Sequence, residues 1–275
     1  MLRRYGESCR NFLSVYALFT ICISLGISLY AGGILMGQIF GWSLWFSVVF
    51  LIVIATSFTV AGGLEAVVVT DSFQSILMIV ASAILTIIGL AKIGSIEKLV
   101  NSVPPDYWKL LRPTDDPKYP WYAILLGYPI LGIWFWCTNQ TIVQRVLGGR
   151  DLKQGQLGSV YAGYLKIITP FIFFLPGIIC KVLHPDLSDP NEAYMTMVTQ
   201  YLPVGIVGLI VAVLIAALIS TVDSQLNSFS TVFTIDIYQK FKKEMTTKQV
   251  IRIGRIVTVI GAVFSVVCAL ALGSV

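Results

Sequence analysis

Long apolar runs recur along this chain, and they constrain its fold more than any other feature. The runs "LWFSVVFLIVIATSFTVAGG" and "GIVGLIVAVLIAALIS" contain no charged residue. A helix needs about 20 apolar residues to cross the core of a lipid bilayer. The whole chain is 56% hydrophobic and only 12% charged, with a mean hydropathy of +0.83, outside the range of soluble domains. Strand-type alternation is absent, so the sequence predicts an all-α, polytopic membrane protein.

The apolar runs predict seven membrane helices within a single transmembrane domain, 1–275. The expected bounds are 11–38, 42–61, 66–92, 121–145, 156–182, 204–238 and 250–273. An odd number of spans places the two ends of the chain on opposite sides of the membrane.

The Lys and Arg residues of the short connections predict the orientation, because cytoplasmic loops carry an excess of them. The side of the N-terminus receives twelve: Arg3, Arg4, Arg10, Arg145, Arg150, Lys153, Lys240, Lys242, Lys243, Lys248, Arg252 and Arg255. The other side receives six: Lys92, Lys98, Lys109, Arg112, Lys118 and Lys181. We therefore predict a multi-pass plasma-membrane protein with a cytoplasmic N-terminus, and interpret the basic run "QKFKKEMTTK" as a solvated loop.

Two outer loops are longer than a connection requires. The loop 94–121 is rich in proline and aspartate yet carries Trp108 and Leu110, so we expect it to fold over the extracellular mouth. In the second loop, Asp189 is a capping acceptor before Pro190, with Glu192 three residues after the cap. This pattern predicts a short surface helix that ends before Pro203.

The helix 204–238 carries an unusual set of polar residues. At 100° per residue, one continuous stripe is formed by Ser220, Ser224, Asn227, Thr231 and Thr234, with Thr221, Asp223 and Ser228 on its flanks. Hydroxyls beside a carboxylate are oxygen ligands of the kind that a hard monovalent cation prefers. The alternative is that each hydroxyl bonds back to a carbonyl one turn earlier. The stripe with its aspartate favours ion handling.

Two further ionisable residues within the predicted spans are candidates for a functional role, Lys166 and Asp71. Lys166 is midway along its helix, and Pro170 cannot donate to the Lys166 carbonyl, so a polar cavity is expected beside it. The alternative for Lys166 is an ion pair with a carboxylate, in this chain or outside it. Asp71 stands where the third helix begins, where it either caps the helix or hands a cation to the interior.

An aromatic and amide cluster occurs in the helix 121–145. There, Trp134, Phe135 and Trp136 stand beside Asn139 and Gln140. An aromatic face next to amides suits a sugar ring, which has an apolar C–H face and a rim of hydroxyls. The alternative is an ordinary core or interfacial aromatic belt.

Several chemistries find no support in the sequence. The five cysteines are scattered without a CxxC pair, which suggests neither a metal site nor a disulfide framework. The single histidine, His184, has no serine or cysteine partner in the pattern, and no phosphate loop occurs. We expect no enzyme activity, no organic cofactor and no nucleic-acid partner. The oligomeric state is not indicated.

Longer motifs resemble a known family. In order along the chain, they are "GGLEAVVVTDSFQ", "RPTDDPKYPW", "WFWCTNQTIVQRVLGGRDLKQGQLGSVYAGYLK", "LPGII" and "LPVGIVGLIVAVLIAALISTVDSQLNSFSTVFTIDIY". The chain resembles the solute:sodium symporter family, particularly its sodium/glucose cotransporter branch. The resemblance implies part of a LeuT-type fold of two five-helix inverted repeats. The seven helices correspond to the last three of the first repeat and the first four of the second, so we expect the chain to be an internal fragment that does not transport alone.

The resemblance also implies roles for individual residues. A sodium ion would be bound by the Ala217 carbonyl and the hydroxyls of Ser220 and Thr221, completed by a helix not in this chain. Asp71 and Ser224 match positions linked to a further sodium site or exit path. Asp223 departs from the hydroxyl residue usual in the animal glucose transporters, and we include it among the candidate sodium ligands.

For the solute, the resemblance implies contacts with Trp136 and Lys166. Phe135 stands where an inner-gate tyrosine is expected, and Gly132 replaces a polar contact residue. The sequence therefore predicts sodium-coupled symport of a sugar or polyol by alternating access. The alternatives are symport of inositol or another organic solute, and a non-transporting solute sensor or membrane scaffold.

Overall fold

The computed structural model describes residues 2–242 and 244–273, and Lys243 of the predicted basic loop lies outside them. The described chain is helical, with one isolated bridge between Arg112 and Pro120 in place of strands. It divides into two compact units. Unit 1 combines the residues up to Ile76 with those from Val211 onward, and unit 2 comprises Leu77–Ile210. Each unit is described by itself.

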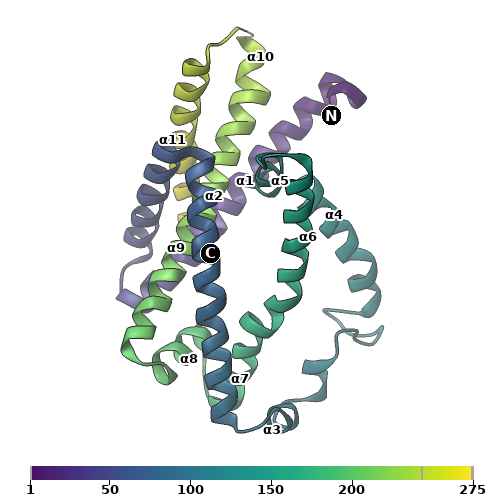
Figure 1. Ribbon diagram of the computed structural model, residues 1–275, viewed down its shortest axis with the longest axis vertical. Coiled ribbons are helices and arrows are strands. Elements are labelled where there is room, and N and C mark those ends of the chain that lie inside the picture. The colour runs from purple at the N-terminus through teal and green to yellow at the C-terminus, as the bar shows by residue number, and fades with distance from the viewer. Residues whose placement is uncertain (1, 243, 274–275) are drawn as a thin grey trace. The chain divides into compact units, whose positions relative to one another are not determined.

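Unit 1 contains the long helices at the two ends of the chain (Figure 1). They are α1 (Leu2–Phe40), the first part of α2 (Leu44–Ile93), most of α9 (Val204–Thr231), the π-helical segment Val232–Tyr238, α10 (Gln239–Phe241) and α11 (Thr247–Leu272). After α1 the chain turns at Gly41, whose φ of 69° is left-handed and therefore favours glycine. Thr246 and Gln249 form a capping box at the start of α11.

The interior of unit 1 is formed by apolar side chains from four helices. It joins Leu25 and Leu29 of α1, Leu51 of α2, Leu226 of α9 and Val257 of α11. Gly33 of α1 lies so close to α2 that an added Cβ would approach the Leu44 side chain to 2.5 Å. Such close approach is typical of membrane helices, whose association depends on van der Waals packing because lipid is as apolar as the interface.

Helix α2 contains two segments that are each long and apolar enough to cross a membrane, Leu44–Gly62 and Val67–Ile93. Thr59 of the first segment contacts Asp223 of α9, and Asp71 of the second segment contacts Ser220, which lies within one turn of Asp223 on the same helix. Twelve residues of straight helix would separate them by about 18 Å. The chain therefore bends between the two segments, which agrees with the separate helices predicted at 42–61 and 66–92.

Unit 2 contains the shorter elements. After the end of α2 come α3 (Ile96–Asn101), the 3-10 turn Pro105–Trp108, the π-helical segment Ala123–Gly127, α4 (Tyr128–Cys137), α5 (Gln140–Leu147), α6 (Leu152–Thr169), the π-helical segment Pro170–Phe174, α7 (Leu175–Leu183), the 3-10 turn Pro190–Glu192 and α8 (Ala193–Tyr201). The short helix predicted after Asp189 is present, and the Asp189 side chain accepts a hydrogen bond from the Asn191 amide at 2.9 Å.

The helix predicted over 121–145 is not continuous. It is π-helical at Ala123–Gly127 and breaks between α4 and α5 at Thr138 and Asn139. The Asn139 side chain accepts a hydrogen bond from the Thr141 amide at 3.0 Å, which caps α5 and fixes the break. The prediction of one continuous helix overlooked the polar residues Thr138, Asn139 and Gln140, which interrupt the apolar run at this point.

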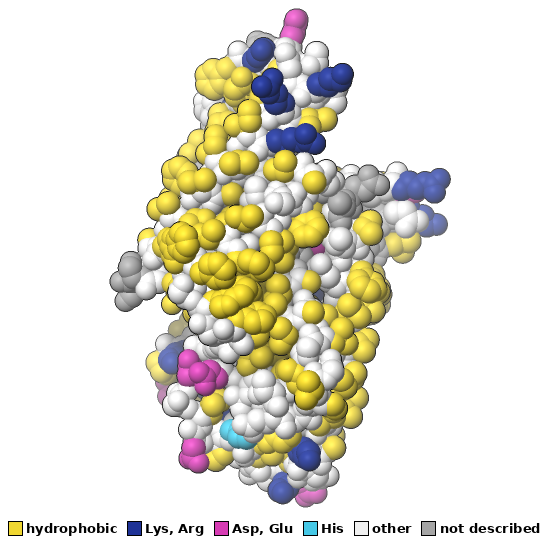
Figure 2. All heavy atoms as spheres, turned by 90° about the vertical axis from the view of Figure 1, so that its left-hand side faces the viewer, with side chains coloured by type: hydrophobic (Ala, Val, Ile, Leu, Met, Phe, Trp, Pro, Cys, Tyr) yellow, Lys and Arg dark blue, Asp and Glu magenta, His cyan; other side chains and the backbone are white. Residues whose placement is uncertain are grey.

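Among the described residues, six helices are long and apolar enough to cross a membrane, and the shorter apolar helix Ala123–Cys137 lies in the remaining predicted span, 121–145. Figure 2 shows one face of the molecule, on which many hydrophobic side chains are exposed. Exposed apolar side chains of this kind suit helices that are in contact with lipid.

Candidate cation and solute sites

Most hydroxyls of the polar stripe on α9 bond back to their own helix. Four hydroxyls donate to the carbonyl oxygen four residues earlier, at oxygen–oxygen distances of 2.7–2.8 Å. They belong to Thr221, Ser224, Ser228 and Thr231. For these four residues the local alternative raised by the sequence is confirmed. Back-bonding satisfies the hydroxyl hydrogen but leaves lone pairs on each oxygen available to a cation.

Ser220 differs from its neighbours because its hydroxyl donates to a residue outside α9. It donates to Oδ1 of Asp71, in the first turns of the second span of α2. This contact joins a hydroxyl and a carboxylate 149 positions apart in the sequence. The structure thus places Asp71 in contact with the stripe.

Asp223 brings a second carboxylate to the same place. Its side chain is only 4% exposed, and its Oδ1 accepts a hydrogen bond from the Ser224 hydroxyl at 3.3 Å. The Thr59 hydroxyl contacts the Asp223 carbonyl at 3.4 Å and donates to the Ala55 carbonyl at 2.9 Å. Thr59 was not among the predicted site residues, although a threonine within an apolar run is a signal that could have indicated a polar contact there.

We define the cation cluster as Asp71, Ser220, Asp223 and Ser224. Ser224 connects its members, since its hydroxyl contacts both the Ser220 carbonyl at 2.7 Å and the Asp223 carboxylate. Two other predicted ligands, the Ala217 carbonyl and the Thr221 hydroxyl, lie 2.8 Å apart on the same part of α9. All these ligands are oxygens, which fit a hard cation such as sodium.

A polar cavity of about 440 Å³ in unit 1 follows the C-terminal half of the stripe. Its lining includes Thr59, Asn227, Ser230, Thr231, Thr234, Arg255 and Thr258, together with apolar residues of α2, of the π-helical segment Val232–Tyr238 and of α11. Thr234 is buried, and its hydroxyl has no hydrogen-bond partner among the described residues. Asn227, Thr231 and Thr234 therefore share one face, as predicted, while Val222 and Leu226 pack in the apolar interior.

The predicted solute residues all belong to unit 2, whereas the cation cluster belongs to unit 1. Phe135 packs edge-on against Trp136 with ring centroids 5.3 Å apart, and Trp136 itself is 40% exposed. Asn139 caps α5, and Gln140 is the first residue of that helix.

Lys166 is exposed on α6 and forms no ion pair with any residue that the structure describes. Pro170 begins a π-helical segment four residues later, as expected where a proline cannot donate to the carbonyl of the preceding turn. The polar cavity predicted beside Lys166 stays a prediction. The ion pair that was an alternative for Lys166 does not occur within the described chain.

Taken together, the fold and the cation cluster define a multi-pass helical membrane protein with a set of oxygen ligands of which Asp223 and Ser224 are buried. The family model of the sodium:solute symporter family matches residues 1–274. The chain belongs to this family.

Curated relatives support the assignment. The chain is 34% identical over 296 residues to the sodium/mannose cotransporter of Bos taurus, covering 94% of this chain and 50% of the relative. It is 32% identical to sodium/glucose cotransporter 4 of Mus musculus, covering 95% and 43%, and 32% identical to the sodium/myo-inositol cotransporter of Homo sapiens, covering 93% and 42%. The chain therefore spans half or less of the length of these relatives.

A solved structure shows the same fold. It is the substrate-bound, outward-open state of a Na⁺-coupled sialic acid symporter described as having a novel Na⁺ site. The two chains share 23% identity and a TM-score of 0.87, over 98% of this chain and 60% of the symporter. The protein thus has part of a LeuT-type fold, as the resemblance implied.

Proposed function

We propose that the protein transports a sugar or polyol together with sodium, by alternating access, as a multi-pass protein of the plasma membrane with its N-terminus in the cytoplasm. The observation that carries the proposal is the hydrogen bond from Ser220 to Asp71. It gathers a hydroxyl and a carboxylate from two helices inside an apolar bundle. Such a carboxylate is expensive in lipid unless it has a partner or a purpose.

Sodium would act by binding one arrangement of the helices more tightly than another. The Ala217 carbonyl and the hydroxyls of Ser220 and Thr221 would form one set of ligands, and Asp71, Asp223 and Ser224 a neighbouring one. A ligand shifts a conformational equilibrium only by its difference in affinity between the two states. A cation bridging Asp71 of α2 and Ser220 of α9 would favour the state in which these helices are close, and the sodium gradient would drive the cycle.

The solute class is supported by the names of the relatives, which are cotransporters of mannose, glucose and myo-inositol. In unit 2, the exposed Trp136 would stack on the apolar face of the solute, while Lys166 and the amides of Asn139 and Gln140 would meet its hydroxyls. Phe135 would support the Trp136 ring through its edge-on contact. Uptake of labelled glucose, mannose, inositol and a non-sugar organic solute into proteoliposomes would identify the substrate.

The sodium assignment is tested by Ser220→Ala and Thr221→Ala in the full-length protein. Both variants remove a proposed ligand, so a higher sodium concentration should be needed for half-maximal uptake. Ser228→Ala is the matched control, because its hydroxyl is buried on the same helix and bonds only back to the Ser224 carbonyl. Unchanged sodium dependence in both test variants would exclude the assignment.

Counterflow distinguishes transport from sensing. Proteoliposomes preloaded with unlabelled solute should accumulate labelled solute against its gradient if the protein is a transporter. A solute sensor or a scaffold would bind the solute without accumulating it.

A further inference from the structure

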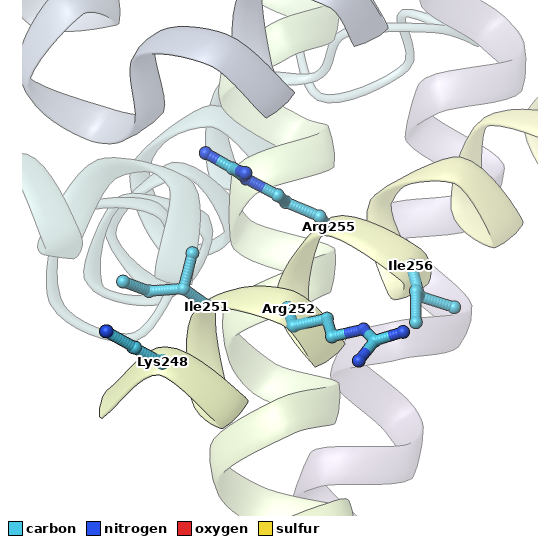
Figure 3. A pocket seen from close by; sticks show the side chains of 5 residues that line it. All are labelled: Lys248, Ile251, Arg252, Arg255 and Ile256. Carbon is cyan, nitrogen blue, oxygen red and sulfur yellow. The ribbon is translucent and has the colours of Figure 1, made fainter. Parts of the chain in front are cut away.

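The first turns of α11 carry an open hollow with a basic rim. The hollow measures about 470 Å³ and is lined by Lys248, Ile251, Arg252, Arg255 and Ile256 (Figure 3). We call it the basic groove. In Figure 3 the two arginine side chains reach out on different sides of the α11 backbone, while Lys248 and Ile251 lie together on one side.

The cations of the basic groove are not neutralised within the described chain. Lys248, Arg252 and Arg255 form no ion pair with any described residue. In the same unit, Arg10 is neutralised by Asp236 at 2.8 Å, and Lys240 donates to the Asn11 side chain. The basic groove therefore has positive charge available for an external anion.

An apolar stripe continues from the basic groove along α11. Counting from Arg252, the positions i+4, i+8, i+11 and i+15 are Ile256, Ile260, Val263 and Val267, and all four side chains are exposed. Helical periodicity places these positions on the face of Arg252. Cationic and apolar groups thus follow one another along a single face.

The length of α11 places the cations at the membrane surface. Its 26 residues extend about 39 Å, whereas the hydrocarbon core of a bilayer is about 30 Å thick. If the apolar stripe lies in the core, Lys248 and Arg252 reach the headgroup level, and Arg255 reaches it by extending its side chain.

We propose that the basic groove and the apolar stripe form a binding site for an anionic phospholipid. The phosphate is held by the Arg252 guanidinium, while Lys248 and Arg255 add positive charge at the rim of the basic groove, and an acyl chain lies along Ile256, Ile260 and Val263. Guanidinium groups bind phosphate through paired hydrogen bonds. Charge alone would fit a free phosphate too, but the adjoining exposed apolar stripe fits the acyl chain of a lipid. None of the four cation-cluster residues lines the basic groove, although Arg255 also lines the polar cavity beside the stripe of α9.

Native mass spectrometry of the purified protein tests the proposal. The protein is titrated with dioleoylphosphatidylglycerol or dioleoylphosphatidylcholine, and bound lipids are counted. We expect at least fivefold tighter binding of the first phosphatidylglycerol than of phosphatidylcholine. The triple variant Lys248→Gln, Arg252→Gln, Arg255→Gln should lose this preference. The matched control Lys92→Gln, Lys98→Gln, Lys118→Gln removes the same charge from exposed lysines of unit 2 and should keep it.

Two further experiments test whether the ligand is a lipid and whether the triple variant is folded. Glycerol 3-phosphate, which lacks acyl chains, should not compete with phosphatidylglycerol at equal concentration, and competition would overturn the lipid assignment. Circular dichroism verifies that the triple variant is folded, and Arg255→Lys, which retains the charge, should keep at least part of the preference. Equal binding of the two lipids by the wild type, or equal loss in both triple variants, would refute the site.

Discussion

The predicted sodium residues and the predicted solute residues differ in how the chain holds them. In unit 1, the cation cluster is formed by contacts between α2 and α9, and Asp223 and Ser224 are buried. In unit 2, Trp136 and Lys166 are exposed, and Phe135 and Asn139 contact mainly residues near them in sequence.

This difference separates two kinds of functional residue. The ligands in unit 1 are positioned by the packing that stabilises the bundle, so the cluster is specified by the contacts of this chain. The residues in unit 2 present an aromatic and amide surface whose partner is the solute of the proposed function. Substitutions in the two units should therefore change different properties, the sodium requirement and the solute requirement.

The largest effect is expected for Asp71→Asn. It removes the charge that faces both Ser220 and the proposed cation. Without this charged ligand, the sodium concentration for half-maximal uptake should rise roughly 10- to 100-fold, a cost of about 1.4–2.8 kcal/mol. Sodium titration of uptake into proteoliposomes measures it. Ser72→Ala, at the neighbouring exposed position, should leave the titration unchanged, and an equal effect of both would contradict the role of Asp71.

A smaller effect is expected for Asp223→Ser. If this carboxylate contributes to cation binding, the sodium concentration for half-maximal uptake should rise about 3- to 10-fold, a cost of about 0.7–1.4 kcal/mol. The same titration with Ser220→Ala gives the reference. A sodium requirement that stays constant while the pH dependence of uptake changes would show that Asp223 handles a proton instead.

The solute side of the comparison is tested by Trp136→Ala against Trp134→Ala. The two rings are almost equally exposed, at 40% and 41%, but two positions of helix turn them to nearly opposite sides. Loss of stacking should raise the KM for the solute about 2- to 10-fold in Trp136→Ala only, with the sodium requirement unchanged. Equal effects of the two substitutions would contradict a specific role of Trp136 in binding.

The smallest effect concerns the loop that precedes α4. The backbone amides of Tyr119 and Lys118, with help from Arg112, lower the pKa of Asp116 below its ordinary value of 3.8. A lowered pKa in the folded state means that the contribution to stability is present above pH 3.8 and is lost as the pH falls through the folded value. Protection of the loop from amide exchange should therefore persist to about pH 4 and then fall. Asp116→Asn should reduce protection at pH 7, whereas Asp115→Asn should not.

The helices and their polar stripe could be predicted because each depends on local periodicity. The apolar runs indicated the spans, and the spacing of Ser220, Ser224 and Asn227 indicated a common face. The cap at Asp189 was also local, since the acceptor, the proline and the helix are adjacent in sequence.

Other features depended on tertiary contacts that periodicity does not record. The pairing of Ser220 with Asp71 and the approach of Thr59 to Asp223 require the bend within α2. The break at Asn139 depends on one side chain competing with the helix for the Thr141 amide. Motif resemblance had suggested Asp71 as a sodium residue, but residue chemistry alone left capping as its default role.

The hydrogen bond between Ser220 and Asp71 has a consequence for how firmly a sodium ion can be held under the proposed function. A cation that binds the carboxylate must replace the serine proton there, so its binding free energy is reduced by the strength of that hydrogen bond. When the ion departs, the hydroxyl donates to the carboxylate again, so the partly buried charge keeps a hydrogen-bond partner. Because the Ser220 hydroxyl competes with sodium for the carboxylate, the site favours rapid release of sodium over tight binding. A transporter needs such release, since it must discharge its ion in every cycle.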